Sequence, residues 1–213
     1  MKPFIRETLE TVVLAVLLFL LLRASIQNFR VEGASMEPSL LPNEYVFVNK
    51  LAYLQVPIGK IARLVPLWDP PGDTTLYPLG APRFGDVVVF HAPGQDRRDF
   101  VKRVIGLPGD TVALRNGVVY VNARPLSEPY ILAIPAGQTL DPVKVPLGQV
   151  FVMGDNRPAS NDSRSWGPVA ISKVIGRVWV RYWPVGEAQF LTSVDLPDEE
   201  ATFAANHDQA GKR

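Results

Sequence analysis

The chain has 213 residues, and its 22 basic and 21 acidic side chains give a formal net charge of +1 at pH 7, so nucleic-acid binding is not expected. It has no cysteine, which excludes thiol nucleophiles, disulfides and zinc–thiolate sites, and its two histidines, His91 and His207, lie far apart and offer little to a metal. Its 20 prolines and 16 glycines favour turns and strands over a helical bundle, in a length that suits one substantial domain with appendages.

The N-terminal segment combines a charged lead, residues 1–10, with an uninterrupted apolar run, residues 12–22. The run alone is too short for a bilayer, but a helix over residues 9–26 would cover about 27 Å, enough for one span if Arg23 extends its guanidinium to the headgroups. The alternative is a cleaved secretory signal, which also has a basic start and a short apolar core. Because Arg23 stands where a small-x-small cleavage site should follow, we predict a retained single-pass anchor within residues 1–28.

A serine follows this segment closely, in the stretch VEGASMEPSL at residues 31–40. Gly33 and Ala34 are small enough for a substrate backbone to approach Ser35, and Pro38 fixes the direction of the chain after it. Ser35 is therefore a candidate nucleophile at what would be a membrane surface. The alternative is an ordinary surface serine in a linker.

Two strands are predicted in the next part of the chain. Apolar and polar residues alternate toward the end of residues 41–49, and residues 84–90 (FGDVVVF) form a turn and a short buried strand. Between them, residues 53–82 are rich in proline and glycine and indicate a long irregular excursion. His91 ends the second strand with no partner nearby in the sequence, so we expect a structural role for it.

The segment DFVKRVI at residues 99–105 is a predicted strand that carries two adjacent cations. Strand alternation places Phe100, Lys102 and Val104 on one face. Arg103 lies on the other face, so either cation could have apolar neighbours. Arginine stays charged in proteins, whereas a desolvated lysine can lose its proton near neutral pH, so Lys102 is the candidate base. The alternative is a lysine that extends from an edge strand into solvent.

The remaining chain predicts a β domain over residues 29–191. Residues 112–121 contain Asn116-Gly117 between two apolar arms, a hairpin signal, and residues 122–147 suggest loops and short edge strands. Residues 149–153 and 174–183 are predicted strands. The segment between them begins with GDNRPASNDSRSW at residues 154–166, which is dense in side chains that hydrogen-bond locally. Residues 192–213 are polar and acidic, and we expect them to be disordered.

Four motifs then occur in order behind the apolar segment: SMEPSL at 35–40, RFGDVVVF at 83–90, DFVKRVIGLPGD at 99–110 and MGDNRPASNDSRSWGPV at 153–169. With these motifs the chain resembles the bacterial type I signal peptidases, membrane-bound Ser-Lys proteases, over roughly residues 11–184. The resemblance implies a mainly β fold, with a folded antiparallel, barrel-like catalytic domain behind one transmembrane helix. It also implies a lipid-bilayer location, a catalytic domain outside the cytoplasm, exported preproteins as substrates, and no cofactor or metal.

The resemblance assigns roles by position. Ser35 matches the nucleophile, Lys102 the general base, and Ser160 the serine that hydrogen-bonds to the lysine amine and orients it. It further implies that four polar residues keep the site in shape and that four apolar residues line small pockets for the residues before the cut. The polar residues are Asp155, Arg157, Asp162 and Arg164, and the apolar residues are Val31, Leu40, Phe100 and Val101.

The chain departs from the family pattern at two positions. Some members have a serine two residues before the nucleophile, whose hydroxyl helps to stabilise the oxyanion, and this chain has Gly33 there. The oxyanion would then depend mainly on the backbone N–H of Ser35. Where members often have threonine, this chain has Ser39, a conservative change.

Two other functions remain open from the sequence. One is a self-cleaving regulator with a similar Ser-Lys core, which the apolar anchor and the lack of a DNA-binding helical segment disfavour. The other is a membrane-anchored β module that binds secretory proteins without cutting them, which the two intact dyad positions disfavour. Nothing in the sequence indicates an oligomeric state.

Overall fold

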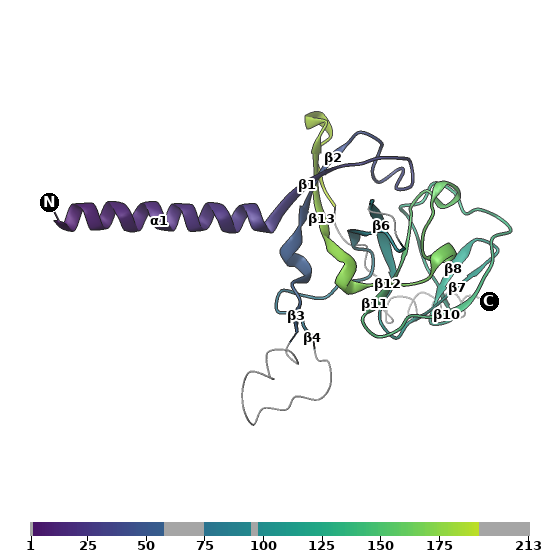
Figure 1. Ribbon diagram of the computed structural model, residues 1–213. Helices are drawn as coiled ribbons and strands as arrows, with labels where there is room; N and C mark the ends of the chain where they lie inside the picture. Colours follow the sequence, from purple (N-terminus) through teal and green to yellow (C-terminus); the bar gives the residue numbers. More distant parts are fainter. Residues whose placement is uncertain (1, 58–74, 95–97, 192–213) are drawn as a thin grey trace, which may run out of the picture.

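Helix α1 (Lys2–Ser25) projects away from a mainly β domain (Figure 1). The computed structural model describes residues 2–57, 75–94 and 98–191. The helix was predicted over residues 9–26 but begins at Lys2, where the charged lead supports it through an i,i+4 ion pair of 2.7 Å between Arg6 and Glu10. Its large apolar side chains between residues 12 and 22 are 47–66% exposed.

None of the helices in the described ranges combines the length and the hydropathy needed to cross a bilayer. The predicted single-pass span is therefore not confirmed.

The main sheet contains the strand that carries Lys102. It has eight strands in the order β1-β2-β13-β5-β6-β11-β12, with β14 paired to β13, and its pairings are antiparallel. This arrangement confirms the predicted mainly β, antiparallel fold. The strands are β1 (Ile26–Arg30), β2 (Tyr45–Asn49), β5 (Val87–His91), β6 (Asp99–Gly106), β11 (Gln149–Met153), β12 (Val169–Ala170), β13 (Val174–Trp183) and β14 (Gln189–Phe190).

A smaller four-stranded sheet, in the order β10-β7-β8-β9, follows β6 in the chain. Its centre is the predicted hairpin, in which Asn116 and Gly117 have positive φ values of 50° and 81° and join the two inner strands. The two outer strands come from residues 122–147, as expected for short edge strands. The four strands are β7 (Thr111–Arg115), β8 (Val118–Val121), β9 (Arg124–Pro125) and β10 (Leu140–Lys144).

Short elements complete the described chain. The strands β3 (Val56–Pro57) and β4 (Thr75–Leu76) pair at the base of the predicted excursion, of which residues 58–74 lie outside the described residues. The predicted disordered tail, residues 192–213, also lies outside them. The short helices are η1 (Lys50–Tyr53), η2 (Arg157–Ala159), α3 (Ser163–Trp166), η3 (Ile171–Lys173) and η4 (Val185–Glu187).

Several strand boundaries differ from the predictions for local reasons. The strands β11 and β13 have the predicted bounds. Strand β2 begins at Tyr45 and not at residue 41, because residues 41–44 form a turn in which the Leu41 N–H donates to the Glu44 carboxylate. Strand β5 starts at Val87 and includes His91. Strand β1 was not predicted, and it begins inside the segment assigned to the anchor. Its apolar and polar residues alternate only weakly, and pairing with β2 stabilises the strand.

The position of β6 brings the site together. It pairs with β5 on one side, where Lys102 lies opposite Val88, and with β11 on the other, where Arg103 lies opposite Met153. Three buried apolar clusters pack around the two sheets, and one of them includes Met36 and Leu40 from the loop between β1 and β2. Burial of these two side chains fixes the loop that carries Ser35.

Candidate active site

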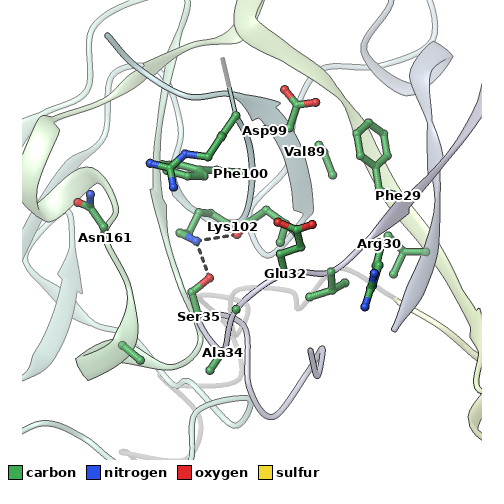
Figure 2. A pocket seen from close by; sticks show the side chains of 16 residues that line it. Phe29, Arg30, Glu32, Ala34, Ser35, Val89, Asp99, Phe100, Lys102 and Asn161 are labelled. Atoms are coloured by element: carbon green, nitrogen blue, oxygen red, sulfur yellow. Dashed lines mark hydrogen bonds between the residues drawn. The ribbon is translucent and has the colours of Figure 1, made fainter. Parts of the chain in front are cut away.

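Ser35 and Lys102 are in direct contact. The Lys102 Nζ donates to the Ser35 Oγ over 2.7 Å and to the Val101 carbonyl over 2.9 Å (Figure 2). Ser35 lies in the loop between β1 and β2. A hydrogen bond of 2.8 Å from the Val31 N–H to the Glu44 carbonyl joins the two ends of this loop. The structure thus brings together two predicted residues that are 67 positions apart in the sequence.

Lys102 is buried, with 4% of its surface exposed. This desolvation lowers the pKa of its amine to about 8, against the opposing effect of the nearby Asp162 and Asp155 carboxylates, which raise it; Arg164 lowers it further. The Phe100 ring, with its centroid 5.4 Å from Nζ, forms part of the apolar surroundings. A pKa lowered by this much makes the neutral amine accessible near neutral pH, at a cost to the folded state of about 3 kcal/mol.

Asp162 organises the loop that follows β11. Its buried carboxylate accepts the Gly154 N–H at 2.9 Å, the Ser160 hydroxyl at 2.6 Å and the Arg164 Nε at 2.8 Å, and it also caps helix α3. Five donors on one carboxylate, counting a second guanidinium nitrogen of Arg164, hold a segment that has little regular structure.

Ser160 was predicted to orient the lysine amine through a hydrogen bond. In the described structure its hydroxyl donates to Asp162 instead, and the amine's partners are Ser35 and Val101. The Ser160 side chain nevertheless lies near the nucleophile, because a Cβ added to Gly154 would collide with both the Ser160 Oγ and the Ser35 carbonyl oxygen.

A buried ion pair lies on the opposite face of β6. Arg103 donates to both Asp155 oxygens, at 2.9 and 2.6 Å, to the Gly85 carbonyl at 2.9 Å and to the Ser39 hydroxyl at 3.1 Å. Arg103 and Asp155 are almost fully buried. Through these bonds one guanidinium joins β6, the loop after β11 and the loop that carries Ser35.

Arg157 and Arg164 hold the same loop from within. Arg157 Nε donates to the Gly154 carbonyl at 3.0 Å, and its other nitrogens pair with the Glu128 carboxylate. Arg164 donates to the Arg157 carbonyl at 2.7 Å. Asp155, Arg157, Asp162 and Arg164 therefore all form bonds that support the loop, and none of them contacts the Ser35 hydroxyl.

A groove of about 430 Å³ opens in front of the Ser35–Lys102 pair. Three of the predicted pocket residues, Val31, Phe100 and Val101, line it. Leu40 does not: it is fully buried in the apolar cluster behind Val31, so its assignment to the pocket surface is wrong. Sequence position alone could not distinguish a residue that lines the groove from a fully buried residue such as Leu40. Other apolar residues of the lining are Phe29, Ala34, Val46 and Val89.

Several residues at the site were not predicted. Arg103 was recognised as a possible buried cation and Asp155 as a support of the site, but their pairing and the role of Ser39 were not predicted, and Glu128 and Tyr130 lie in a region assigned to loops. His91 does have a partner: its Nδ1 lies 2.8 Å from the Asp99 Oδ1 across the β5–β6 pair. Within the described ranges, no group of three or more His, Asp or Glu side chains is arranged to hold a metal ion.

Comparisons with known proteins agree on one family. Residues 5–183 match a family model described as signal peptidase, peptidase S26. A signal peptidase I of Bacillus caldolyticus is 38% identical over 176 residues, covering 76% of this chain and 82% of that protein. A probable signal peptidase I-1 of Synechocystis is 38% identical over 189 residues (85% and 84%), and a signal peptidase IB of Staphylococcus aureus is 31% identical over 209 residues (89% and 95%). A solved structure of a signal peptidase I from Enterococcus faecalis matches with a TM-score of 0.38 and 31% identity, covering 46% of this chain and 97% of that one.

The close approach at Gly154 yields a prediction. In Gly154→Ala the added Cβ would displace Ser160 or the Ser35 backbone, so we expect peptidase activity to fall at least about tenfold and the unfolding free energy to drop by about 1–3 kcal/mol. Gly186→Ala is the matched control, because nothing lies within 4 Å of its added Cβ. Activity assays and urea denaturation of the two variants measure both effects. Parent-like activity of Gly154→Ala would contradict this account of the site.

Proposed function

The chain belongs to the signal peptidase family, peptidase S26, and we propose that it cleaves its substrates with a Ser35–Lys102 dyad through an acyl-enzyme. Membership of the family makes it a serine peptidase that removes signal peptides. The observation that carries the finer proposal is the 2.7 Å contact between the Ser35 Oγ and the buried amine of Lys102. A serine hydroxyl needs an adjacent base to become a good nucleophile, and this amine is in the position of one.

In the first half of the reaction, Ser35 Oγ attacks the scissile carbonyl carbon while the neutral Lys102 amine takes the hydroxyl proton. When the amine is neutral, the 2.7 Å contact reverses and the Ser35 hydroxyl donates to the nitrogen lone pair, while the Val101 carbonyl still accepts one amine hydrogen. The oxyanion that forms is stabilised mainly by the backbone N–H of Ser35, because Gly33 has no side chain to contribute. Collapse of this intermediate breaks the peptide bond, and the Lys102 ammonium gives its proton to the leaving amine.

In the second half, water attacks the ester between Ser35 and the signal peptide. Lys102, neutral again, takes a proton from this water and then returns it to the Ser35 oxygen, which regenerates the dyad. Arg103, Asp155, Arg157, Asp162 and Arg164 do not enter these steps. They hold the loops that carry the reacting groups.

The groove supports cleavage after small-x-small sites in exported preproteins. Val31, Phe100 and Val101 give it an apolar wall beside the dyad, which suits small apolar side chains before the cut. An extended substrate points alternate side chains in the same direction. The first and third residues before the cut would therefore face the apolar wall, and the residue between them would face solvent.

We also propose that α1 attaches the enzyme to the cytoplasmic membrane, with the catalytic domain on the extracytoplasmic side where preproteins emerge. The exposed apolar side chains of residues 12–22 support this, because the β domain does not cover them (Figure 1). Attachment there would place the groove close to the membrane face at which signal peptides are cut.

The dyad predicts the result of three substitutions. Ser35→Ala removes the nucleophile and Lys102→Ala the base, while Lys102→Arg puts a permanently protonated group in the base's position. We expect each to lower kcat at least about a thousandfold in cleavage of a preprotein with an Ala-x-Ala site. Lys144→Ala, an exposed lysine of β10, is the control and should keep parent activity. If folded Lys102→Ala cuts at the parent's rate, the base is a different group.

The lowered pKa of Lys102 predicts the pH dependence. The base works in its neutral form, so activity is lost as pH falls and gained as pH rises through a midpoint of about 8. About a tenth of the amine is neutral at pH 7 and about nine tenths at pH 9, so kcat/KM should rise about tenfold between them and level off above. Initial rates from pH 6 to pH 10 measure this. A midpoint near 10.5, or a profile independent of pH, would contradict the assignment of Lys102.

Membrane attachment by α1 predicts a loss of binding when charge enters its apolar surface. In Leu17→Arg/Leu21→Arg two guanidinium groups would have to enter the acyl region, at about 2–3 kcal/mol each, so the variant should no longer float with phospholipid vesicles. Leu132→Arg is the control, since this leucine is 79% exposed on the β domain. Parent-like flotation of the double variant would exclude α1 as the attachment.

A further inference from the structure

A short segment after β9, residues 128–130, reaches from the four-stranded sheet into the loops of the site. The Glu128 side chain is 5% exposed, and its carboxylate accepts the Tyr130 hydroxyl at 2.8 Å and the Arg157 guanidinium at 3.0 Å and at a second, shorter contact. Tyr130 is 9% exposed. The side chains of Glu128 and Tyr130 are thus almost completely buried and hydrogen-bonded, although neither residue comes from the main sheet.

Tyr130 packs against the guanidinium that follows the candidate base in the sequence. The centre of the Arg103 guanidinium lies 4.1 Å from the centroid of the Tyr130 ring. The edge of the same guanidinium makes four hydrogen bonds, to Asp155, Gly85 and Ser39. The ring covers the flat face of the group, a position in which an aromatic ring attracts a cation and excludes water. Arg103 is therefore held in one orientation against Asp155.

This orientation matters for Lys102. The charged groups that act on its amine are Asp162 and Asp155, which raise its pKa, and Arg164, which lowers it. Arg103 neutralises Asp155 at bonding distance. If Arg103 moved away, the Asp155 charge would act on Lys102 with less compensation, and the amine would hold its proton to higher pH.

The same segment also acts on the nucleophile through Arg157. This guanidinium bonds Glu128 at one end and the Gly154 carbonyl at the other. Two residues farther on, the Asn156 N–H donates to the Ser35 carbonyl over 3.1 Å. The bonds of residues 128–130 therefore extend to both members of the pair within a few contacts.

We propose that Tyr130 is a positioning residue for the Ser35–Lys102 pair, that it acts by locking Arg103 onto Asp155, and that Glu128 holds Tyr130 and Arg157 in place. The proposal rests on the dyad function proposed above. It gives the four-stranded sheet a part in catalysis, because its edge segment sets the charge balance beside the base.

The test compares Tyr130→Leu, which removes the ring, with Tyr130→Phe, which removes the bond to Glu128 and keeps the ring. Tyr120→Leu is the matched control: Tyr120 also packs on an arginine, Arg115, at 5.2 Å in the same sheet, but away from the groove. The three variants and the parent chain are assayed on a preprotein with an Ala-x-Ala site, with kcat and KM measured from pH 6 to pH 10 and folding checked by thermal melting.

We expect Tyr130→Leu to lower kcat about tenfold with KM nearly unchanged, and to move the midpoint of the pH profile up by about half a unit or more. Tyr130→Phe should lower kcat about threefold and leave the midpoint in place, because the ring still covers Arg103. Tyr120→Leu should match the parent. A purely structural role would lower the melting temperature without moving the pH midpoint.

The proposal is overturned if folded Tyr130→Leu has the parent's kcat and midpoint. If Tyr130→Leu does not fold, Tyr130→Phe decides: a lowered kcat at unchanged KM supports the proposal, and the parent's kcat overturns it. An active parent with unaffected variants contradicts this inference alone, whereas an inactive parent contradicts the proposed dyad and this inference with it.

Discussion

Burial of one lysine is the constraint on which the rest of the structure depends. A lysine side chain loses its charge near neutral pH only when water is kept from it, and Lys102 satisfies this at 4% exposure on an inner strand of the main sheet. The loop between β1 and β2 must then bring Ser35 to the amine. Met36 and Leu40 pack in an apolar cluster that holds this loop, so the same packing excludes water and positions the proposed nucleophile.

A dry lysine requires a balanced electric field around it. Two carboxylates, Asp155 and Asp162, lie near enough to raise its pKa, and each is paired with an arginine of its own. Buried ion pairs are poor sources of stability, because desolvation offsets much of their attraction. Their value here lies in geometry: they hold loops of little regular structure in one arrangement, and each carboxylate near Lys102 has an arginine to balance its charge.

Much of this could be predicted from the sequence. Strand patterns located β11 and β13, the Asn116-Gly117 turn located the hairpin, and the motif order brought Ser35 and Lys102 together across 67 positions. Local patterns failed where a role depends on three-dimensional neighbours. Leu40 has the apolar character of a pocket residue but is fully buried in the core, and the Ser160 hydroxyl donates to the Asp162 carboxylate. Glu128 and Tyr130 gave no signal, because their partners come from β6 and from the loop after β11.

The pairing of β6 has a consequence for how this chain tolerates change. Lys102 and Arg103 are neighbours in sequence on opposite faces, and β5 and β11 fix their register from both sides. A slip by one residue that brought Arg103 into the place of Lys102 would move Lys102 to the opposite face and put a permanent cation where the proposed base lies. Insertions or deletions of single residues within β6 would therefore inactivate a domain that could still fold. The exposed residues 132–134 lie outside that register and beyond Tyr130, and length variation among descendants of this sequence should accumulate there and not in the strand.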